Sequence, residues 1–267
     1  MDAIILAGGT LRGEFAAATG TTVKALLAPT GETLLERAVR AAKESDYITR
    51  VAVGGPPEVE EVARRSGADF CTPGGPSAVD TALRAAEAMN ATGMLYLGAT
   101  DLPYVTAADV NHLVQQMPDL PAVGYAVVEK GPFDAAFADH HKRFVTLSNG
   151  RFRSGGAALI HASLLKPLEP MLRAAFAGRK SMGRLAVLVG FEVFLRFLLS
   201  QALGPRVAPS TEDLRRRIEH KLGCPGVILY GTPGIGFDID KLSDWEYVRR
   251  RAQAPVGEDP RETAEAH

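Results

Sequence analysis

The stretch Ala3-Ile4-Ile5-Leu6-Ala7-Gly8-Gly9 is an apolar run of strand length that stops at two glycines. Similar apolar runs recur along the first half of the chain, and helical patterns that open with capping boxes separate them. The apolar runs lie at 50–53, 68–71, 93–98 and 122–128, and the helical patterns at 32–44, 57–66, 76–90 and 106–117. This alternation predicts an α/β fold, with a doubly wound, mostly parallel, Rossmann-like sheet and helices on both faces.

The second half of the chain has a different pattern. Short apolar runs at 144–147 and 157–160 precede a helical stretch over 163–223 that prolines and glycines interrupt. Strand patterns return at 226–229 and 235–239, and a last helix is predicted from Ser243 to about Arg251. We therefore expect one domain over 1–253, in which 163–223 is a helical insertion that forms an acceptor subdomain, followed by a disordered tail over 254–267.

The composition is that of an ordinary globular protein. Thirty basic residues against 31 acidic ones give a formal net charge of −1, and the basic residues do not gather into the patch that a nucleic-acid binder needs. Cys71 and Cys224 are too few and too far apart for a disulfide framework or a zinc site. The first residues lack the basic start of a signal peptide, so we expect a cytoplasmic protein.

One apolar segment, from Leu185 to Leu203, is long enough to cross a bilayer. Glu192 and Arg196 lie within it four residues apart, where they can pair on one face of a helix, and Gly190 divides the run. We therefore expect a buried or half-buried helix and no membrane span. The alternative is a surface that meets lipid or an apolar substrate.

The loop after the first apolar run is the first candidate for chemistry. Gly8 and Gly9 allow the backbone to approach a ligand closely and to turn N–H groups toward an anion. Arg12 and Lys24 add cationic side chains to the same loop. The loop matches neither the dinucleotide fingerprint GxGxxG nor the P-loop, and a tight turn with two solvated charges is the alternative.

This loop and three later stretches resemble the MobA-like NTP transferases, a family of nucleotidyltransferases with a glycosyltransferase-A-like fold. The matching stretches are Leu6-Ala7-Gly8-Gly9 with Lys24-Ala25-Leu26-Leu27 and 31–37, then 74–80, 95–103 and 236–245. The resemblance covers roughly the first 130 and the last 30 residues, so it does not explain the helical middle of the chain.

In that family the glycine loop wraps the triphosphate, and an arginine and the following lysine hold phosphates. The resemblance therefore implies that Lys24, Arg12 and Asp101 are catalytic. It also implies a nucleotide-binding set composed of Leu6, Ala7, Gly8, Gly9, Lys24, Gly74, Gly75 and Ser77. Arg12 comes early in a loop that is longer than usual, and Ser77 is equally suited to cap a helix.

Three aspartates are the expected metal ligands. Asp101 follows an apolar strand in an Asp-x-Pro sequence, and the resemblance implies that it binds Mg²⁺, which prefers oxygen ligands. Near the other end of the chain, Asp238 and Asp240 would share one face of a strand while Ile239 points to the core. We expect Asp238 to be the second ligand, with Asp240 in reserve. Asp244 is expected to be an acid in the first turn of the last helix.

Two basic clusters are expected to bind the second substrate. The first is a glycine-containing turn before a strand, formed by Arg151, Arg153, Gly155 and Gly156, and the second stands at a helix start, with Arg179 and Lys180. A phosphate on the acceptor would explain both clusters. The alternative is that these charges are simply solvated.

Together these features predict a Mg²⁺-dependent nucleotidyltransferase. It would transfer NMP from an NTP, CTP or GTP, to a phosphorylated small-molecule acceptor and release pyrophosphate. Positioning and electrostatics suffice for such a reaction, so no nucleophilic side chain is needed. A glycosyltransferase that uses a nucleotide-sugar and a non-catalytic nucleotide-binding homologue are the alternatives. We expect no nucleic-acid partner; a homodimer is compatible with the sequence, which does not determine the oligomeric state.

Overall fold

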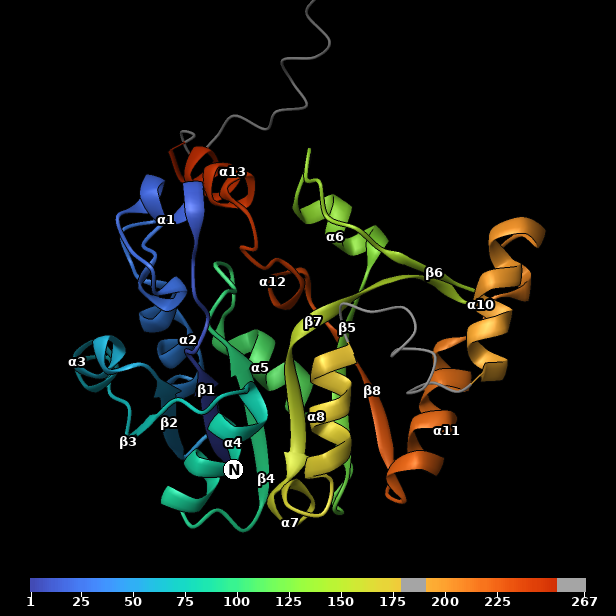
Figure 1. Cartoon of the computed structure of the whole chain (residues 1–267), viewed down its shortest axis with the longest axis horizontal. Helices are drawn as coiled ribbons and strands as arrows, with labels where there is room; N and C mark the ends of the chain where they lie inside the picture. The colour runs from blue at the N-terminus through green and yellow to red at the C-terminus, as the bar shows by residue number, and fades with distance from the viewer. Residues whose placement is uncertain (179–190, 254–267) are drawn as a thin grey trace, which may run out of the picture.

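The computed structural model describes residues 1–178 and 191–253, and it is built on one central eight-stranded sheet (Figure 1). The strands are β1 (Asp2–Leu6), β2 (Arg50–Gly55), β3 (Phe70–Pro73), β4 (Met94–Ala99), β5 (Val123–Glu129), β6 (Val145–Leu147), β7 (Gly150–His161) and β8 (Gly226–Gly231). Their order is β3-β2-β1-β4-β7-β5-β8, with β6 paired to β7. Strand β7 runs antiparallel to its neighbours and all other pairs are parallel, which confirms the predicted mostly parallel α/β fold.

Helices connect the strands and cover the sheet (Figure 1). They are α1 (Gly13–Thr19), α2 (Leu34–Lys43), α3 (Glu60–Arg65), α4 (Ala78–Ala88), α5 (Ala107–Val114), α6 (Lys130–Ala136), α7 (Ala162–Leu165), α8 (Glu169–Gly178), α10 (Phe191–Leu203), α11 (Thr211–Leu222), α12 (Pro233–Gly236) and α13 (Leu242–Gln253), with short 3-10 turns η1 (Lys24–Leu26), η2 (Pro57–Val59) and η3 (Pro205–Val207). Two of the predicted capping boxes form, at Thr33 and Thr106, where the side chain of each threonine accepts from the backbone of the acid three residues later. Ser77 caps α4 with its side chain alone, and Ser243 lies inside α13 and not before it.

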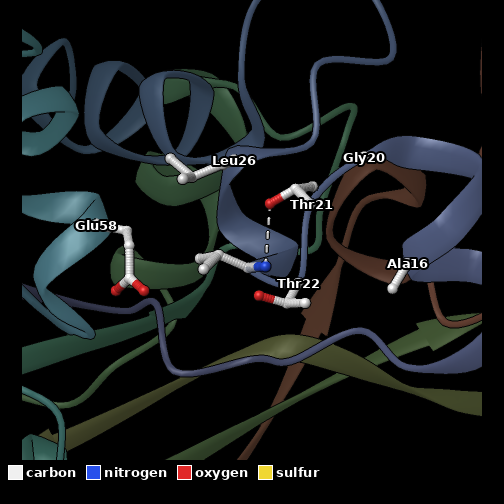
Figure 2. A pocket seen from close by; sticks show the side chains of 7 residues that line it. Ala16, Gly20, Thr21, Thr22, Leu26 and Glu58 are labelled. Atoms are coloured by element: carbon white, nitrogen blue, oxygen red, sulfur yellow. Dashed lines mark hydrogen bonds between the residues drawn. The ribbon is translucent and has the colours of Figure 1, made fainter.

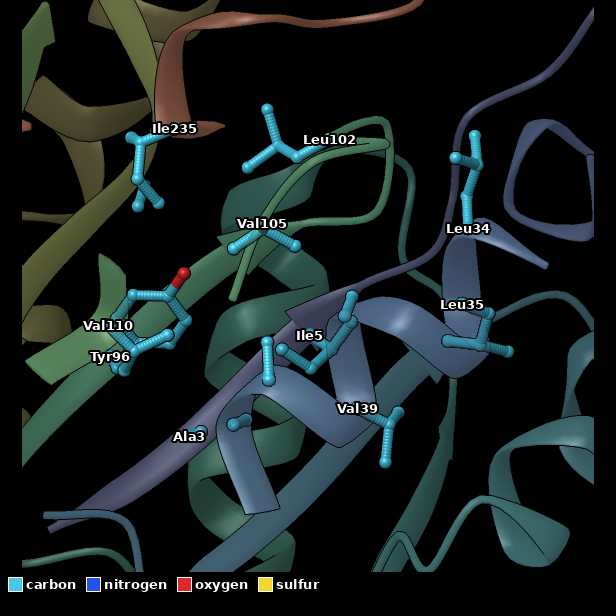
Figure 3. Packing of buried hydrophobic residues seen from close by; sticks show 14 of the residues in the cluster. Ala3, Ile5, Leu34, Leu35, Val39, Tyr96, Leu102, Val105, Val110 and Ile235 are labelled. Carbon is cyan, nitrogen blue, oxygen red and sulfur yellow. The ribbon is translucent and has the colours of Figure 1, made fainter. Parts of the chain in front are cut away.

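Alternation along the central strands divides the core between the two faces of the sheet. Ala3 and Ile5 belong to the cluster under α2 and α5, whereas Ile4 belongs to the cluster under α4. Figure 3 shows the first cluster, in which Val39 of α2 and Tyr96 of β4 lie on opposite sides of Ile5. Because successive side chains of a strand point to opposite faces, a strand that is covered on both sides is apolar throughout.

The strand predicted over 235–239 is wrong. Ile235 lies in α12, which begins with Pro233 in its first turn, and residues 237–240 form no strand. Proline suits the start of a helix because its fixed φ is helical and it has no N–H to leave unpaired. Phe237 and Ile239 are nevertheless buried, so the apolar alternation reflects burial and not pairing within the sheet.

Within the described ranges, no helix is both long and apolar enough to cross a membrane. Helix α10 carries Arg196, whose guanidinium pairs with Asp213 of α11 at 3.1 Å. The side chain of Glu192, the predicted partner of Arg196, lies outside the described part of the chain, as do residues 185–190 and the tail over 254–267.

Candidate active site

The glycine loop after β1 is closed by its own backbone. The Leu11 N–H donates to the Thr22 carbonyl at 2.8 Å, and the Lys24 N–H donates to the Gly9 carbonyl at 3.0 Å. Lys24 thus returns beside Gly9, where an added Cβ would lie 3.2 Å from the Lys24 Cβ. Gly8 is exposed, and a Cβ at this position would meet nothing within 4 Å. The loop therefore leaves an open backbone edge next to a lysine.

Lys24 brings together acids from two distant parts of the chain. Its Nζ lies 2.6 Å from Asp101 Oδ2 and 3.0 Å from Asp240 Oδ1. Asp101 follows β4, and its carbonyl accepts the Ile239 N–H at 2.9 Å, which holds the segment around Asp240 against the end of that strand. The Lys24 side chain is 12% exposed, whereas that of Asp240 is 62% exposed. The cation is covered, and one of its acids faces solvent.

Burial and charge act in opposite directions on these groups. Burial alone would lower the pKa of Lys24, but the charges of Asp101 and Asp240 outweigh it, so that pKa is raised. The partial loss of hydration in this crowded site would raise the pKa of Asp240, but the charge of Lys24 outweighs it, so that pKa is lowered. For Asp238, burial prevails and the pKa is raised. Lys24 and Asp240 are therefore a charged pair at neutral pH.

Asp238 has a different set of partners. Its Oδ1 lies 2.7 Å from Arg153 Nη2 of β7 and 3.1 Å from Lys142 Nζ. Lys142 also lies 2.8 Å from Asp244 Oδ2, and that oxygen accepts the backbone N–H groups of Asp240 and Lys241. Asp244 thus serves the first turn of α13, as its place in the sequence predicts. Lys142 had no local signal in the sequence, because its acids lie about a hundred residues further along.

The donor set is suited to a hard divalent cation. Among the described residues, no group of three or more histidine, cysteine, aspartate or glutamate side chains is arranged to hold a metal ion. Asp101 and Asp240 instead share one ammonium, Lys24. Both offer carboxylate oxygens, which Mg²⁺ prefers, and both already converge on a single positive charge. The carboxylate chemistry of the two acids therefore fits Mg²⁺, and Lys24 holds the position between them.

The predicted nucleotide loop before α4 is held by that helix. The Gly75 N–H donates to Thr81 Oγ1 at 2.9 Å, and the Ser77 hydroxyl accepts from the Asp80 N–H and donates to Asp80 Oδ2 at 2.6 Å. A Cβ on Gly75 would lie 2.2 Å from the Asp80 Cβ, so this glycine is required by packing. Ser77 is the N-cap of α4. The contact predicted between Ser77 and the base stays a prediction.

The remaining predicted nucleotide residues lie around the glycine loop and α4. Ala7 is fully buried, Leu6 ends β1, and Gly74 donates its N–H to the Gly55 carbonyl at 2.8 Å. Arg12 is the N-terminal flank of α1, is exposed, and has no hydrogen-bond or ion-pair partner within the described ranges. Its guanidinium is therefore available to a ligand.

The basic turn predicted before a strand is wrong, because residues 151–156 lie inside β7. A Cβ on Gly155 would lie 2.8 Å from Ile235 Cγ2, and one on Gly156 would lie 2.6 Å from Leu102 Cδ2, so both glycines admit core side chains. Arg151 is exposed, whereas Arg153 pairs with Asp238. The second predicted cluster, with Arg179 and Lys180, lies outside the described residues.

A separate hollow lies beside the return of the glycine loop (Figure 2). It is a cavity of about 420 Å³ lined by Ala16, Gly20, Thr21, Thr22, Val23, Leu26 and Glu58. Thr21 Oγ1 accepts the Val23 N–H at 3.1 Å, which helps to shape its wall. None of the predicted site residues lines this cavity, so it is distinct from the place where Lys24, Asp101 and Asp240 meet.

Comparison with solved structures finds proteins of the same fold. A hypothetical transferase from Thermus thermophilus is 25% identical, with a TM-score of 0.75, over 91% of this chain and 98% of that one. CMP:2-keto-3-deoxy-manno-octonic acid synthetase complexed with CTP is 16% identical, with a TM-score of 0.56, over 94% of this chain and 97% of that one. The 2-C-methyl-D-erythritol 4-phosphate cytidylyltransferase from Thermus thermophilus is 15% identical, with a TM-score of 0.52, over 94% of this chain and 98% of that one. At such identities these last two share the fold alone. Comparison with curated proteins gives no significant match.

A family model gives more direct functional information. The MobA-like NTP transferase domain matches residues 3–187, which include the glycine loop, Lys24 and Asp101. This match favours nucleotidyl transfer over the nucleotide-sugar chemistry considered from the sequence. The chain therefore belongs to the MobA-like NTP transferase family and is a nucleotidyltransferase.

Proposed function

We propose that this enzyme transfers NMP from CTP or GTP to a phosphorylated small molecule and releases pyrophosphate, with Mg²⁺ as its cofactor. One observation carries the proposal: Lys24 meets Asp101 and Asp240 beside Gly9, the neighbour of the open Gly8. They do so at the carboxyl end of the parallel strands, where doubly wound sheets bind their ligands.

The glycine loop is proposed to hold the triphosphate. Gly8 and Gly9 let phosphate oxygens approach the main chain, and Lys24 and Arg12 supply positive charge. Lys24 leaves its two acids to do so, whereas Arg12 is already exposed and unpaired in the described part of the chain. The base is proposed to lie near the loop with Gly74, Gly75 and Ser77.

Asp101 and Asp240 are proposed to hold Mg²⁺, which supplies positive charge to the phosphates when bound. Asp240 is preferred to Asp238 as the second ligand, because Asp240 shares Lys24 with Asp101. Asp238 already has two cationic partners, Arg153 and Lys142.

The proposed reaction is an in-line displacement. An oxygen of the acceptor phosphate forms a bond to the α-phosphorus, and the bond from that phosphorus to the bridging oxygen of pyrophosphate breaks, so pyrophosphate leaves with the electron pair. The protein aligns the two substrates and places positive charge near the leaving group. Exposed Arg151, at the same sheet edge, is proposed to attract the acceptor phosphate, together with Arg179 and Lys180.

Calorimetry with each of the four NTPs, with and without Mg²⁺, tests this function. We expect one NTP to bind in a Mg²⁺-dependent manner, and pyrophosphate to be released when phosphorylated acceptors are added. In Asp101→Ala this binding should be lost while the protein stays folded, because the side chain lies at the sheet edge and is 24% exposed. Failure of all four NTPs to bind would refute the proposal.

A further inference from the structure

The segment that carries Asp238 and Asp240, residues 237–241, is here called the acid loop. It follows α12, precedes α13 and is not part of the sheet. Its backbone is tied to the segment that follows β4 by the bond from the Ile239 N–H to the Asp101 carbonyl. Outside the sheet, the other backbone N–H groups of a segment need partners elsewhere, and Asp244 Oδ2 accepts those of Asp240 and Lys241. What holds the acid loop therefore decides where Asp240 points.

Lys142 lies at the centre of those contacts. Its Nζ contacts both carboxylates that flank Asp240, at 3.1 Å from Asp238 Oδ1 and 2.8 Å from Asp244 Oδ2. It also donates to the Asp238 carbonyl and lies 4.9 Å from the centre of the Phe237 ring. The Lys142 side chain is only 8% exposed. A buried ammonium with this many partners fixes groups on both sides of Asp240 at once.

The two acids of the loop are thereby assigned to different cations. Asp238 contacts Lys142 and Arg153. Asp240 contacts Lys24, the ammonium that Asp101 also contacts. Asp244, the other partner of Lys142, accepts the Asp240 N–H at 2.9 Å and so orients the backbone of Asp240 directly.

We propose that Lys142 is a positioning residue that fixes the acid loop so that Asp240 faces Asp101. The proposal rests on the proposed function, in which these two acids hold the metal. Lys142 touches neither substrate nor metal in this account. It acts through Asp238 and Asp244, in the way that groups behind a metal ligand orient it.

Mn²⁺ binding, followed by electron paramagnetic resonance with a non-hydrolysable analogue of the NTP that binds, tests the proposal. Lys142→Met should weaken Mn²⁺ binding about 10- to 100-fold, the usual cost of losing an outer-shell partner. The Mg²⁺ concentration that gives half the maximal rate should rise in parallel, while the KM for the NTP at saturating Mg²⁺ changes little. Lys142→Arg should restore part of the Mn²⁺ affinity.

Lys43→Met is the control, because it removes a lysine–aspartate pair, Lys43 with Asp69 at 3.1 Å, on α2 away from the acid loop. It should leave Mn²⁺ binding unchanged. If Lys142→Met does not fold, Asp244→Asn weakens the other side of the same contact, and its Mn²⁺ affinity should fall in the same direction.

Normal Mn²⁺ affinity in a folded Lys142→Met or Asp244→Asn protein would overturn the proposal, provided that Asp101→Asn loses Mn²⁺ binding. If Asp101→Asn itself binds Mn²⁺ as the wild type does, the metal site of the proposed function is the part that fails. The two failures are thus distinguishable.

Discussion

Lys24 illustrates what a sequence motif predicts about one side chain, and what it does not predict. The resemblance in the sequence implies a lysine that holds phosphates, but not the partners it takes without nucleotide. Those partners, Asp101 and Asp240, lie 77 and 216 residues away along the chain. A buried ammonium needs nearby negative charge to offset its lost hydration, so Lys24 pairs with the acids proposed for the metal.

Replacing Lys24 with methionine should therefore affect two ligands in opposite directions. Mn²⁺ affinity without nucleotide should rise about tenfold, or ~1.4 kcal/mol, because the ammonium no longer competes for Asp101 and Asp240. The affinity for the Mg²⁺–NTP complex should fall by about 1.5–3 kcal/mol, the value of a charged hydrogen bond. Calorimetry of each ligand measures both effects. A drop in both affinities would contradict the view that Lys24 occupies the place of the cation.

Alanine at Gly8 and at Gly75 gives a second test. Each glycine belongs to a Gly-Gly pair, but an added Cβ would enter open space at Gly8 and meet the Asp80 side chain at Gly75. Gly75→Ala should destabilise the protein by about 1–3 kcal/mol, since its Cβ would overlap with Asp80. Gly8→Ala should change stability by less than about 0.5 kcal/mol, because its Cβ enters open space, yet NTP affinity should fall. Urea unfolding and calorimetry separate the two. Full NTP affinity in Gly8→Ala would exclude close approach of a phosphate there.

Local signals predicted the helices better than the last part of the sheet. The capping boxes at Thr33 and Thr106 depend on residues three apart, so they are readable without the fold. The direction of β7, and the absence of a strand at 235–239, depend on partners far away in the sequence. In the acid loop, buried apolar residues alternate with less buried aspartates although the loop pairs with no strand. Its sequence pattern is therefore the same as that of a strand.

A link between two helices joins the nucleotide loop to the second half of the chain. Arg173 of α8 donates to both oxygens of Asp80 in α4, at 2.8 and 2.5 Å, and Asp80 holds the Ser77 hydroxyl. The hydrogen bond from Arg173, followed by that from Ser77, holds the pKa of Asp80 well below its ordinary value. A carboxylate whose pKa is lowered in the folded protein stabilises the fold fully at pH values above its unfolded pKa. This stabilisation is lost as the pH falls through the folded pKa. The link is therefore complete at neutral pH.

Arg173→Met should loosen the nucleotide loop from a distance. Amide hydrogen exchange should become faster in 74–77 and in α8 at neutral pH, and the difference from wild type should shrink in strong acid as Asp80 becomes protonated. Arg64→Met is the control, because Arg64 pairs with Glu60 within α3 alone. Unchanged exchange in 74–77 would mean that α4 holds this loop without help from α8.

At the scale of the whole molecule, the candidate site brings together residues from the beginning, the middle and the end of the described chain. They meet next to the end of the central strand β4. Residues 24, 101 and 240 belong to three separate stretches, each with its own motif in the sequence. The motifs identified the stretches, and the rule for doubly wound sheets predicted the edge on which they meet. The sequence led us to expect Asp238 as the second metal ligand. The proposal of Asp240 instead rests on partners that only the fold reveals, because Lys142 and Arg153 already contact Asp238.

Because the site draws on distant stretches of the chain, bound nucleotide should stabilise the glycine loop and the acid loop together. An NTP at about 100 times its Kd with Mg²⁺ should add about 2.7 kcal/mol to the free energy of unfolding, and so raise Tm by several degrees. Scanning calorimetry measures the shift, and hydrogen exchange should show joint protection of the glycine loop and the acid loop. Protection of the glycine loop alone would mean that the acids at 238–240 do not take part.

The reversed direction of β7 has a consequence for how such enzymes diversify. Its beginning lies at the same edge as the ends of β4, β5 and β8, so the chain between β5 and β7 leaves and re-enters the sheet beside the site. Insertions or deletions between β5 and β6 would remodel the chain beside the site without shifting any register inside the sheet. Lys142 lies in that connection. A homologue in which this connection differs would therefore need Lys142, or another cation, to pair with Asp238 and Asp244.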